Sequence, residues 1–139
     1  MTIHREIRAA LETQLNNTSG LPTIAFENVS FDPTTEVSFI TTSFIPTVRR
    51  PTVRGLNPIQ RYQGLFAVTV YCKEGDGPAT ADEFAEKVIE AFEATTDLQF
   101  TNSENETVTV SIDYAERKQG LLESPWYYIP INIGWYTYK

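Results

Sequence analysis

The chain has 139 residues, a formal net charge of −7 and an aromatic content of 12%. This length fits one domain (residues 1–139), large enough to bury roughly two-thirds of the surface of its unfolded chain. A single cysteine excludes an internal disulfide, and the charged opening MTIHREIRAALETQL lacks the apolar core of a signal peptide. No apolar run approaches the length needed to cross a bilayer, so we expect no membrane association.

The first predicted element is an amphipathic helix over about Ile3 to Asn16. Its apolar residues fall at helical spacing on one face, and they are Ile3, Ile7, Ala10, Leu11 and Leu15. Thr2 is placed to cap this helix, and Glu6 lies near its positively polarised end. The segment from Ile24 to Val29 is then predicted as a short edge strand.

Two long strand-like segments follow and predict a β-hairpin over about residues 36–72. Glu36 to Val48 and Tyr62 to Cys72 are rich in the β-branched and aromatic residues that favour strands. At about 3.3 Å per residue the first arm reaches roughly 40 Å, whereas a compact domain of this length is roughly 37 Å across. We therefore expect the hairpin to project from the body, with Pro46 favouring an edge or a bulge in the first arm.

The segment between these arms is basic and reads RRPTVRGLNPIQR. It carries four arginines and no acidic residue, namely Arg49, Arg50, Arg54 and Arg61, so the rest of the chain sums to −11 (−7 minus +4). A compact basic patch on an acidic body is typical of a surface that meets an acidic partner, either nucleic acid or protein. A solvated polar loop is the plain alternative.

A second amphipathic helix is predicted over about Ala81 to Ala94. Thr80 and Glu83 have the spacing of a capping box, and the apolar stripe comprises Phe84, Ala85, Val88, Ile89 and Phe92. The opposite face is acidic, since only Lys87 balances Asp82, Glu83, Glu86, Glu90 and Glu93.

Three strands complete the predicted fold. Leu98 to Thr101 is short, and Thr107 to Tyr114 alternates so that Val108, Val110, Ile112 and Tyr114 share one side. Trp126 to Tyr138 is long, with Ile129, Ile131, Ile133 and Trp135 on one face. The order α–β–β–β–α–β–β–β predicts an α+β fold in which a mixed, mostly antiparallel sheet has both helices on one face. Aromatic side chains from four segments are expected on its other face, which is an unusual surface for a monomer.

The residue types that carry enzyme chemistry are sparse in this sequence. The only histidine, His4, lies in the first helical turn, and Cys72 at a strand end is expected to be a buried structural thiol. Glu86 and Glu90 lie one turn apart, but a solvated acidic face is the expected reading, and zinc-ligand spacing is absent. We therefore predict no catalytic residue, no cofactor, no metal and no enzymatic activity.

Four segments, taken in order, resemble the small tail terminator proteins of long-tailed bacteriophages. They are the N-terminal helix followed by IAFENVSFDP (Ile24 to Pro33), FITTSFIP (Phe39 to Pro46), the arginine hairpin closing on RYQGLFAVTVY (Arg61 to Tyr71), and YCKEGDGPATADEFAEKVIEAF (Tyr71 to Phe92). The resemblance runs from Met1 to about Phe92 and more loosely to the C-terminus. A head-to-tail connector or a minor tail protein of similar size remains the alternative.

The resemblance implies a structural virion protein that is assembled in the host cytoplasm. Such proteins form rings, typically hexamers, that cap the tail tube, end its polymerisation and offer a surface to the neck or head. The implied partners are further copies of the chain, the tail-tube protein and a neck or head-completion protein, while genomic DNA passes through without specific binding. The residues predicted to make protein contacts are Arg49, Arg50, Arg54, Arg61 and Tyr62 on the hairpin and Glu86 and Glu90 on the second helix, as complementary patches.

A nucleic-acid-binding module is the rival interpretation of the segment from Arg49 to Arg61. Phosphate contacts would give it a salt-dependent affinity. The surrounding charge of −11 (−7 minus +4) opposes this interpretation, and Tyr62 is the only aromatic residue interleaved with the arginines. A small-molecule enzyme of this fold class has only generic support, because fold does not imply function.

Overall fold

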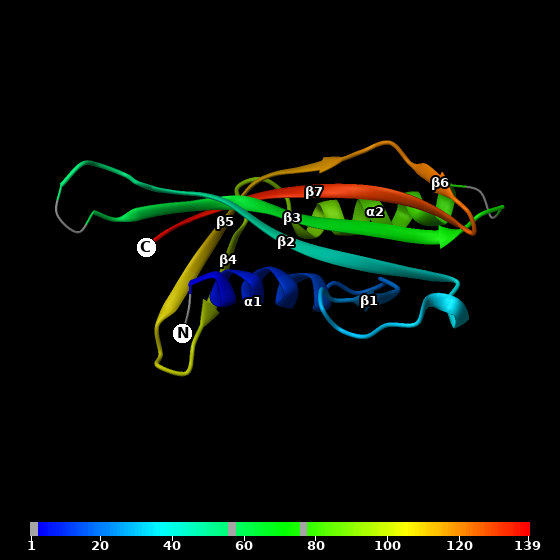
Figure 1. Cartoon of the computed structure of the whole chain (residues 1–139), viewed down its shortest axis with the longest axis horizontal. Coiled ribbons are helices and arrows are strands. Elements are labelled where there is room, and N and C mark those ends of the chain that lie inside the picture. The colour runs from blue at the N-terminus through cyan, green and yellow to red at the C-terminus, as the bar shows by residue number, and fades with distance from the viewer. Residues whose placement is uncertain (1–2, 56–57, 76–77) are drawn as a thin grey trace.

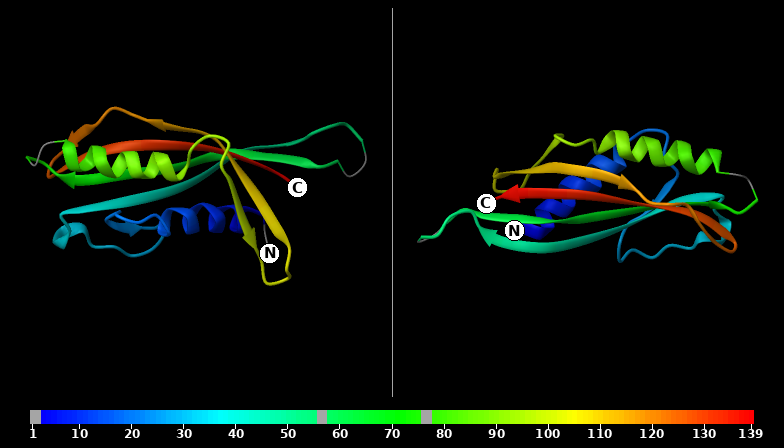
Figure 2. Two further views of the ribbon diagram at one scale, coloured as in Figure 1. Left: turned by 180° about the vertical axis from the view of Figure 1, so that it is seen from behind. Right: turned by 90° about the horizontal axis from the view of Figure 1, so that it is seen from above.

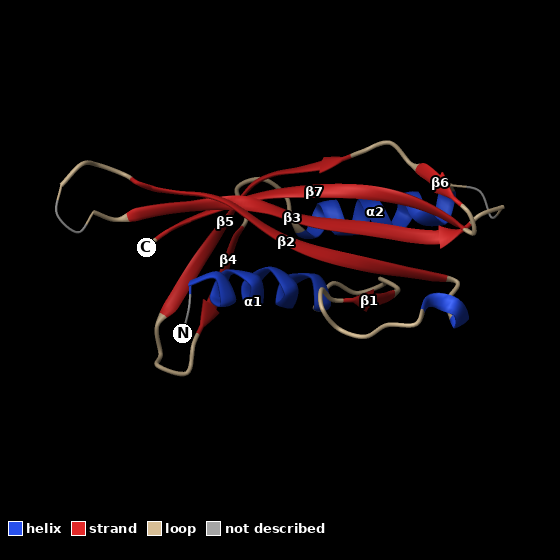
Figure 3. Cartoon of the chain, viewed as in Figure 1, coloured by secondary structure: helices blue, strands red, loops and turns tan. Residues whose placement is uncertain are grey.

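The computed structural model describes residues 3–55, 58–75 and 78–139, and in it two helices pack against one face of a curled sheet (Figures 1 and 3). The elements are α1 (Ile3–Asn16), β1 (Thr23–Ala25), a 3-10 turn η1 (Pro33–Thr35), β2 (Ser38–Pro51), β3 (Gln60–Lys73), α2 (Ala79–Ala91), β4 (Asp97–Thr101), β5 (Thr107–Arg117), β6 (Leu121–Glu123) and β7 (Trp126–Tyr138). The strands form one seven-stranded sheet in the order β1-β2-β3-β7-β5-β4, with β6 added to β7. Only the β1–β2 pair is parallel, so the predicted mixed, mostly antiparallel α+β fold is confirmed.

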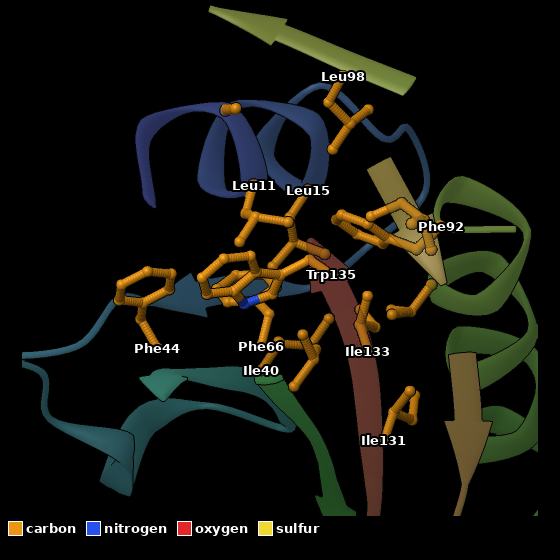
Figure 4. Packing of buried hydrophobic residues seen from close by; sticks show 14 of the residues in the cluster. Leu11, Leu15, Ile40, Phe44, Phe66, Phe92, Leu98, Ile131, Ile133 and Trp135 are labelled. Carbon is orange, nitrogen blue, oxygen red and sulfur yellow. The ribbon is translucent and has the colours of Figure 1, made fainter. Parts of the chain in front are cut away.

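The hydrophobic core lies between the two helices and one face of the sheet (Figure 2). The predicted stripe of α1 is buried, and α2 buries Ala81, Ala85 and Val88. The predicted inward face of β7 is buried as well, from Ile129 to Trp135, and Figure 4 shows Trp135 packed among Phe66, Phe44 and the leucines of α1. Because every second residue of β3 and β7 enters this core, the intervening residues face the other side of the sheet.

Strand β3 is paired on both sides for nearly its whole length. β2 pairs with it from Ser38–Cys72 to Pro51–Gln60, and β7 pairs with it from Trp126–Lys73 to Tyr138–Arg61. The two hairpin arms therefore extend closer to the tip than the predicted ends at Val48 and Tyr62. Their loop lies at one end of the molecule, beyond the end of β7 (Figure 1).

The start of α2 differs from the prediction. The helix begins at Ala79 with Pro78 at the N-cap position, and no side chain of the described residues caps it. The Asp82 N–H already bonds to the Pro78 carbonyl, so Thr80 lies inside the first turn and cannot form the predicted capping box with Glu83. The other predicted cap, Thr2, lies outside the described residues.

The side to which Tyr114 points also differs from the prediction. The pairing of β5 with β7 shifts register between Ile112 and Tyr114, which is a β-bulge. The extra residue turns Tyr114 to the face opposite Ile112, where it lies over Gly134 and is 40% exposed. A second bulge, between Pro46 and Val48, shifts the register of β2 in the same way.

Glu6 is fully buried although the sequence indicated only a role at the helix end. Its Oε1 accepts a hydrogen bond of 2.8 Å from the Asn102 side chain, and the Lys139 ammonium lies 3.7 Å from Oε2. Asn102 in turn accepts hydrogen bonds from the backbone N–H groups of Glu104 and Glu106, so it holds the β4–β5 turn. One carboxylate therefore ties α1 to this turn and to the end of β7.

The first prediction concerns this carboxylate. We expect Glu6→Ala to lower the free energy of unfolding by about 3 kcal/mol, because it leaves the buried Asn102 amide without its acceptor and removes a buried ionic partner. Urea denaturation measures the change. The exposed side chain of Glu104 in the same turn provides the control, and Glu104→Ala should cost less than about 0.5 kcal/mol. Equal losses for the two variants would contradict the assignment.

The second prediction compares two glycines of the central strands. A Cβ on Gly64 would lie 2.4 Å from the Ile45 carbonyl oxygen and 2.8 Å from the buried Trp135 ring. The three atoms nearest to a Cβ on Gly134 all belong to the ring of the exposed Tyr114, which has room to rotate away. We expect Gly64→Ala to destabilise by about 1–3 kcal/mol and Gly134→Ala by clearly less. Thermal melts of both variants measure which one is destabilised more. A larger loss of stability for Gly134→Ala than for Gly64→Ala would contradict the prediction.

Candidate protein-interaction surface

The face of the sheet opposite the helices is uncovered by any helix of the described chain (Figure 2). We call it the open face. At its centre the register places small side chains in rows across β2, β3 and β7, namely Thr41 beside Thr69, and Ser43, Ala67 and Asn132. These side chains are small and partly exposed, so the middle of the open face is only weakly apolar.

Aromatic rings gather at the end of the open face that is remote from the hairpin tip. Phe39 stacks on Tyr71 with ring centroids 4.6 Å apart, and Tyr71 stacks on Tyr128 at 5.4 Å. Phe31 and Trp126 contact Phe39 as well, which leaves that ring only 6% exposed. Burial raises the pKa of the Tyr71 phenol, so this hydroxyl is neutral across the physiological range. The cluster is largely packed on itself.

The basic end of the open face lies at the hairpin. Arg61 stacks over the Tyr136 ring at 4.8 Å, and Arg50 lies directly opposite Arg61 in the β2–β3 register. Arg49 points to the helix side, where it lies 5.5 Å over the Tyr62 ring, and Arg54 is exposed in the loop. The structure thus divides the four predicted arginines between two faces and the tip.

The predicted contact residue Tyr62 requires a correction. Its side chain faces the core and is 8% exposed, and the His4 ring contacts it edge-on at 5.9 Å. The alternation of β3 puts Tyr62 on the same side as Phe66 and Val68, so it supports Arg49 and offers little surface of its own.

A pocket of about 210 Å³ opens beside the basic end, between β3, β5 and β7. Its lining includes Arg61, Gln63 and Asp113, with Gly64 and Gly134 beneath them. The Nε of Arg61 is buried and makes no hydrogen bond to the described residues. Arg61 therefore lines this pocket while one of its donors stays unsatisfied by the described residues. Gln63 and Asp113 were missed at the sequence level, because their approach depends on the β5 bulge.

The acidic helix face lies away from this pocket. Glu86 and Glu90 are exposed on α2, and neither takes part in the ion pairs formed by the described residues. Lys87, the one cation of this face, instead donates to the Gly20 carbonyl. The structure does not bring the two predicted patches together, since α2 lies behind the sheet and far from the hairpin tip (Figures 1 and 2).

Within residues 3–55, 58–75 and 78–139, no group of three or more His, Cys, Asp and Glu side chains is arranged to hold a metal ion. No helix in these described ranges is long and apolar enough to cross a membrane. Cys72 is buried, as predicted.

Comparison with known proteins places the chain in a family. The model of the family described as "Phage tail terminator protein" matches residues 6–135. No curated protein matches the chain. A solved structure with 22% sequence identity aligns with a TM-score of 0.74 over 100% of this chain and 97% of the other, which shows a shared fold. Because the family match covers most of the sequence, this chain belongs to the phage tail terminator family, a family of structural components of the phage tail.

Proposed function

We propose that this chain caps the head-proximal end of a phage tail tube, ends tube polymerisation and offers the surface for joining to the head or neck. The observation that carries the proposal is the family match over residues 6–135. The same match to a tail family favours the terminator over the two alternatives, a head-to-tail connector and a minor tail protein.

The proposed working form is a ring of copies of this chain, most simply a hexamer. A closed ring needs two different, complementary surfaces on each subunit. The open face with its basic end and the acidic face of α2 are two such surfaces on opposite sides of the sheet. The remaining proposed partners are the tail-tube protein on one side of the ring and a neck or head-completion protein on the other.

Specific binding of nucleic acid is not part of the proposal. The arginines are divided between two faces of the hairpin, so they do not form one continuous track along a phosphate backbone. The net charge of −7 also favours passage of DNA through a ring without adhesion.

We also propose that the chain acts without enzymatic turnover. The His4 ring contacts Tyr62, whereas Cys72 lies ten residues farther along the same strand, or about 33 Å away along it. These two side chains therefore cannot form a nucleophile–base pair, which requires hydrogen-bond distance.

The test of the proposed function is electron microscopy of intact tails in which this chain carries a label. We expect label density confined to a single ring at the head-proximal end of the tube. Tails assembled without the chain should vary in length or exceed the normal length, because nothing ends their polymerisation. A label found along the tube, at the distal tip or nowhere in the tail would refute the proposal.

A further prediction concerns the hairpin arginines. Changing Arg49, Arg50, Arg54 and Arg61 together to serine should abolish ring formation or tail joining, scored as infectious particles in complementation of a phage that lacks this protein. The free energy of unfolding should fall by only about 1 kcal/mol, since the losses are cation–π contacts at or near the surface. A control chain with serine at the exposed positions Arg5, Lys73 and Lys118 should still join. Normal joining by the hairpin variant would contradict the assignment.

A further inference from the structure

We propose that Arg50 and Arg61 bind the carboxylates of Glu86 and Glu90 in a second copy of this chain, so that the open face of one subunit docks on α2 of the next. This inference rests on the proposed ring and names the contact that builds it. Both groups of charges lack ion-pair partners among the described residues of one chain.

The first step is the like-charge pair on the open face. Arg50 and Arg61 are directly opposed in the β2–β3 register and lie on the same side of the hairpin. Like charges in directly opposed cross-strand positions destabilise a sheet. The ion pairs of the described residues include neither arginine, so no carboxylate in the described chain neutralises them. This juxtaposition favours an external anion.

The second step is the geometry of Arg61. Its guanidinium is held 4.8 Å over the Tyr136 ring, and its buried Nε has no acceptor among the described residues. Asp113 lines the same pocket but makes no ion pair with Arg61. A guanidinium presents a planar fork of donors that matches a carboxylate with two parallel hydrogen bonds. A carboxylate that enters the pocket of about 210 Å³ would therefore meet the guanidinium of Arg61 in its lining.

The third step identifies the carboxylates. Glu86 and Glu90 are four residues apart on α2, so they lie on one face with Cβ atoms about 5–6 Å apart. Both are exposed, and Lys87, between them in the sequence, is drawn away by its hydrogen bond of 3.3 Å to the Gly20 carbonyl. These two adjacent carboxylates, which form no ion pair with the described residues, match two adjacent guanidinium groups of which the same is true.

The fourth step identifies the source as a second copy. The basic end and α2 lie on opposite faces of the sheet and far apart along the molecule, so they cannot meet within one chain (Figures 1 and 2). A contact between two different surfaces of identical chains is heterologous, and such contacts close into a ring when the rotation between subunits permits. A phosphate backbone is a poorer match, since Asp113 lies in the pocket and the chain carries a net charge of −7.

Reciprocal charge reversal tests the contact. One variant carries Arg50→Glu and Arg61→Glu, and the other carries Glu86→Arg and Glu90→Arg. We expect wild-type chain to self-associate at low ionic strength in sedimentation velocity, and each variant by itself to associate at least tenfold more weakly. An equimolar mixture should recover association, because the acidic pocket of the first variant then meets the basic helix of the second and the unchanged surfaces pair as before.

The controls separate this contact from general charge effects. Arg5→Glu with Lys118→Glu lowers the net charge by the same amount as Arg50→Glu with Arg61→Glu and should leave association unchanged. Added salt should weaken wild-type association. Thermal melts check that each variant is folded. If a double variant does not fold, the single reversals Arg50→Glu and Glu86→Arg, both at exposed positions, provide the same reciprocal test.

Three results would overturn the proposal. The first is a wild-type chain that stays monomeric throughout the concentration series, and the second is a mixture that fails to recover association. The third is that wild-type chain binds a short DNA duplex, and that Arg50→Glu with Arg61→Glu abolishes this binding without affecting self-association. Labelled tails separate this contact from the proposed function. If the charge-reversal variants still form a ring at the end of the tail, only the proposed contact is refuted. If the mixture of variants recovers association but the label is not at the end of the tail, only the proposed function is refuted.

Discussion

The rest of the structure depends on the double pairing of β3. Because β2 and β7 form hydrogen bonds to β3 along almost its whole length, each side chain of β3 points either into the core or to the open face. Phe66, Val68 and Val70 enter the core beneath the helices, while Gln63, Leu65 and Ala67 face the open side. A slip of one residue would exchange these sets, so the buried half of the strand fixes the position of the half that is available for contacts.

Two bulges modify this alternation at the points where the open face acquires its chemistry. The bulge in β2 between Pro46 and Val48 leaves Arg50 beside Arg61, and sends Arg49 to the helix side over Tyr62. The bulge in β5 brings Tyr114 over Gly134 at the edge of the Arg61 pocket. Bulges frequently re-aim side chains near functional sites. Here they position the charged end of the open face while the strands beneath stay regular.

The sequence predicted those features that depend on local periodicity. The bounds of α1, the inward faces of α1 and β7 and the strand order of the hairpin follow from apolar spacing within single segments. The burial of Glu6 was not predictable in this way, because its partners Asn102 and Lys139 are distant in sequence. Nor was the side to which Tyr114 points, since one inserted residue reverses the alternation. Of the candidate site, the sequence predicted the arginines but not the pocket around Arg61. That pocket forms only where β3, β5 and β7 come together in the folded sheet.

The distribution of charge gives a physical reason for copies of a chain of this family to associate in one orientation. Within one molecule, the sheet holds the basic end of the open face apart from the acidic face of α2. The sheet keeps its shape because its central strands are paired with each other and its inner face is packed in the core. The chain therefore cannot neutralise its own charges by folding differently, and the net charge of −7 opposes those encounters in which like charges meet. Association becomes favourable where copies are aligned so that opposite patches meet before like charges do, because only short-range pairing outweighs the screened repulsion. On the proposed function, the end of a tail tube reinforces that alignment. The sheet that separates the patches also sets the angle at which each new subunit is added.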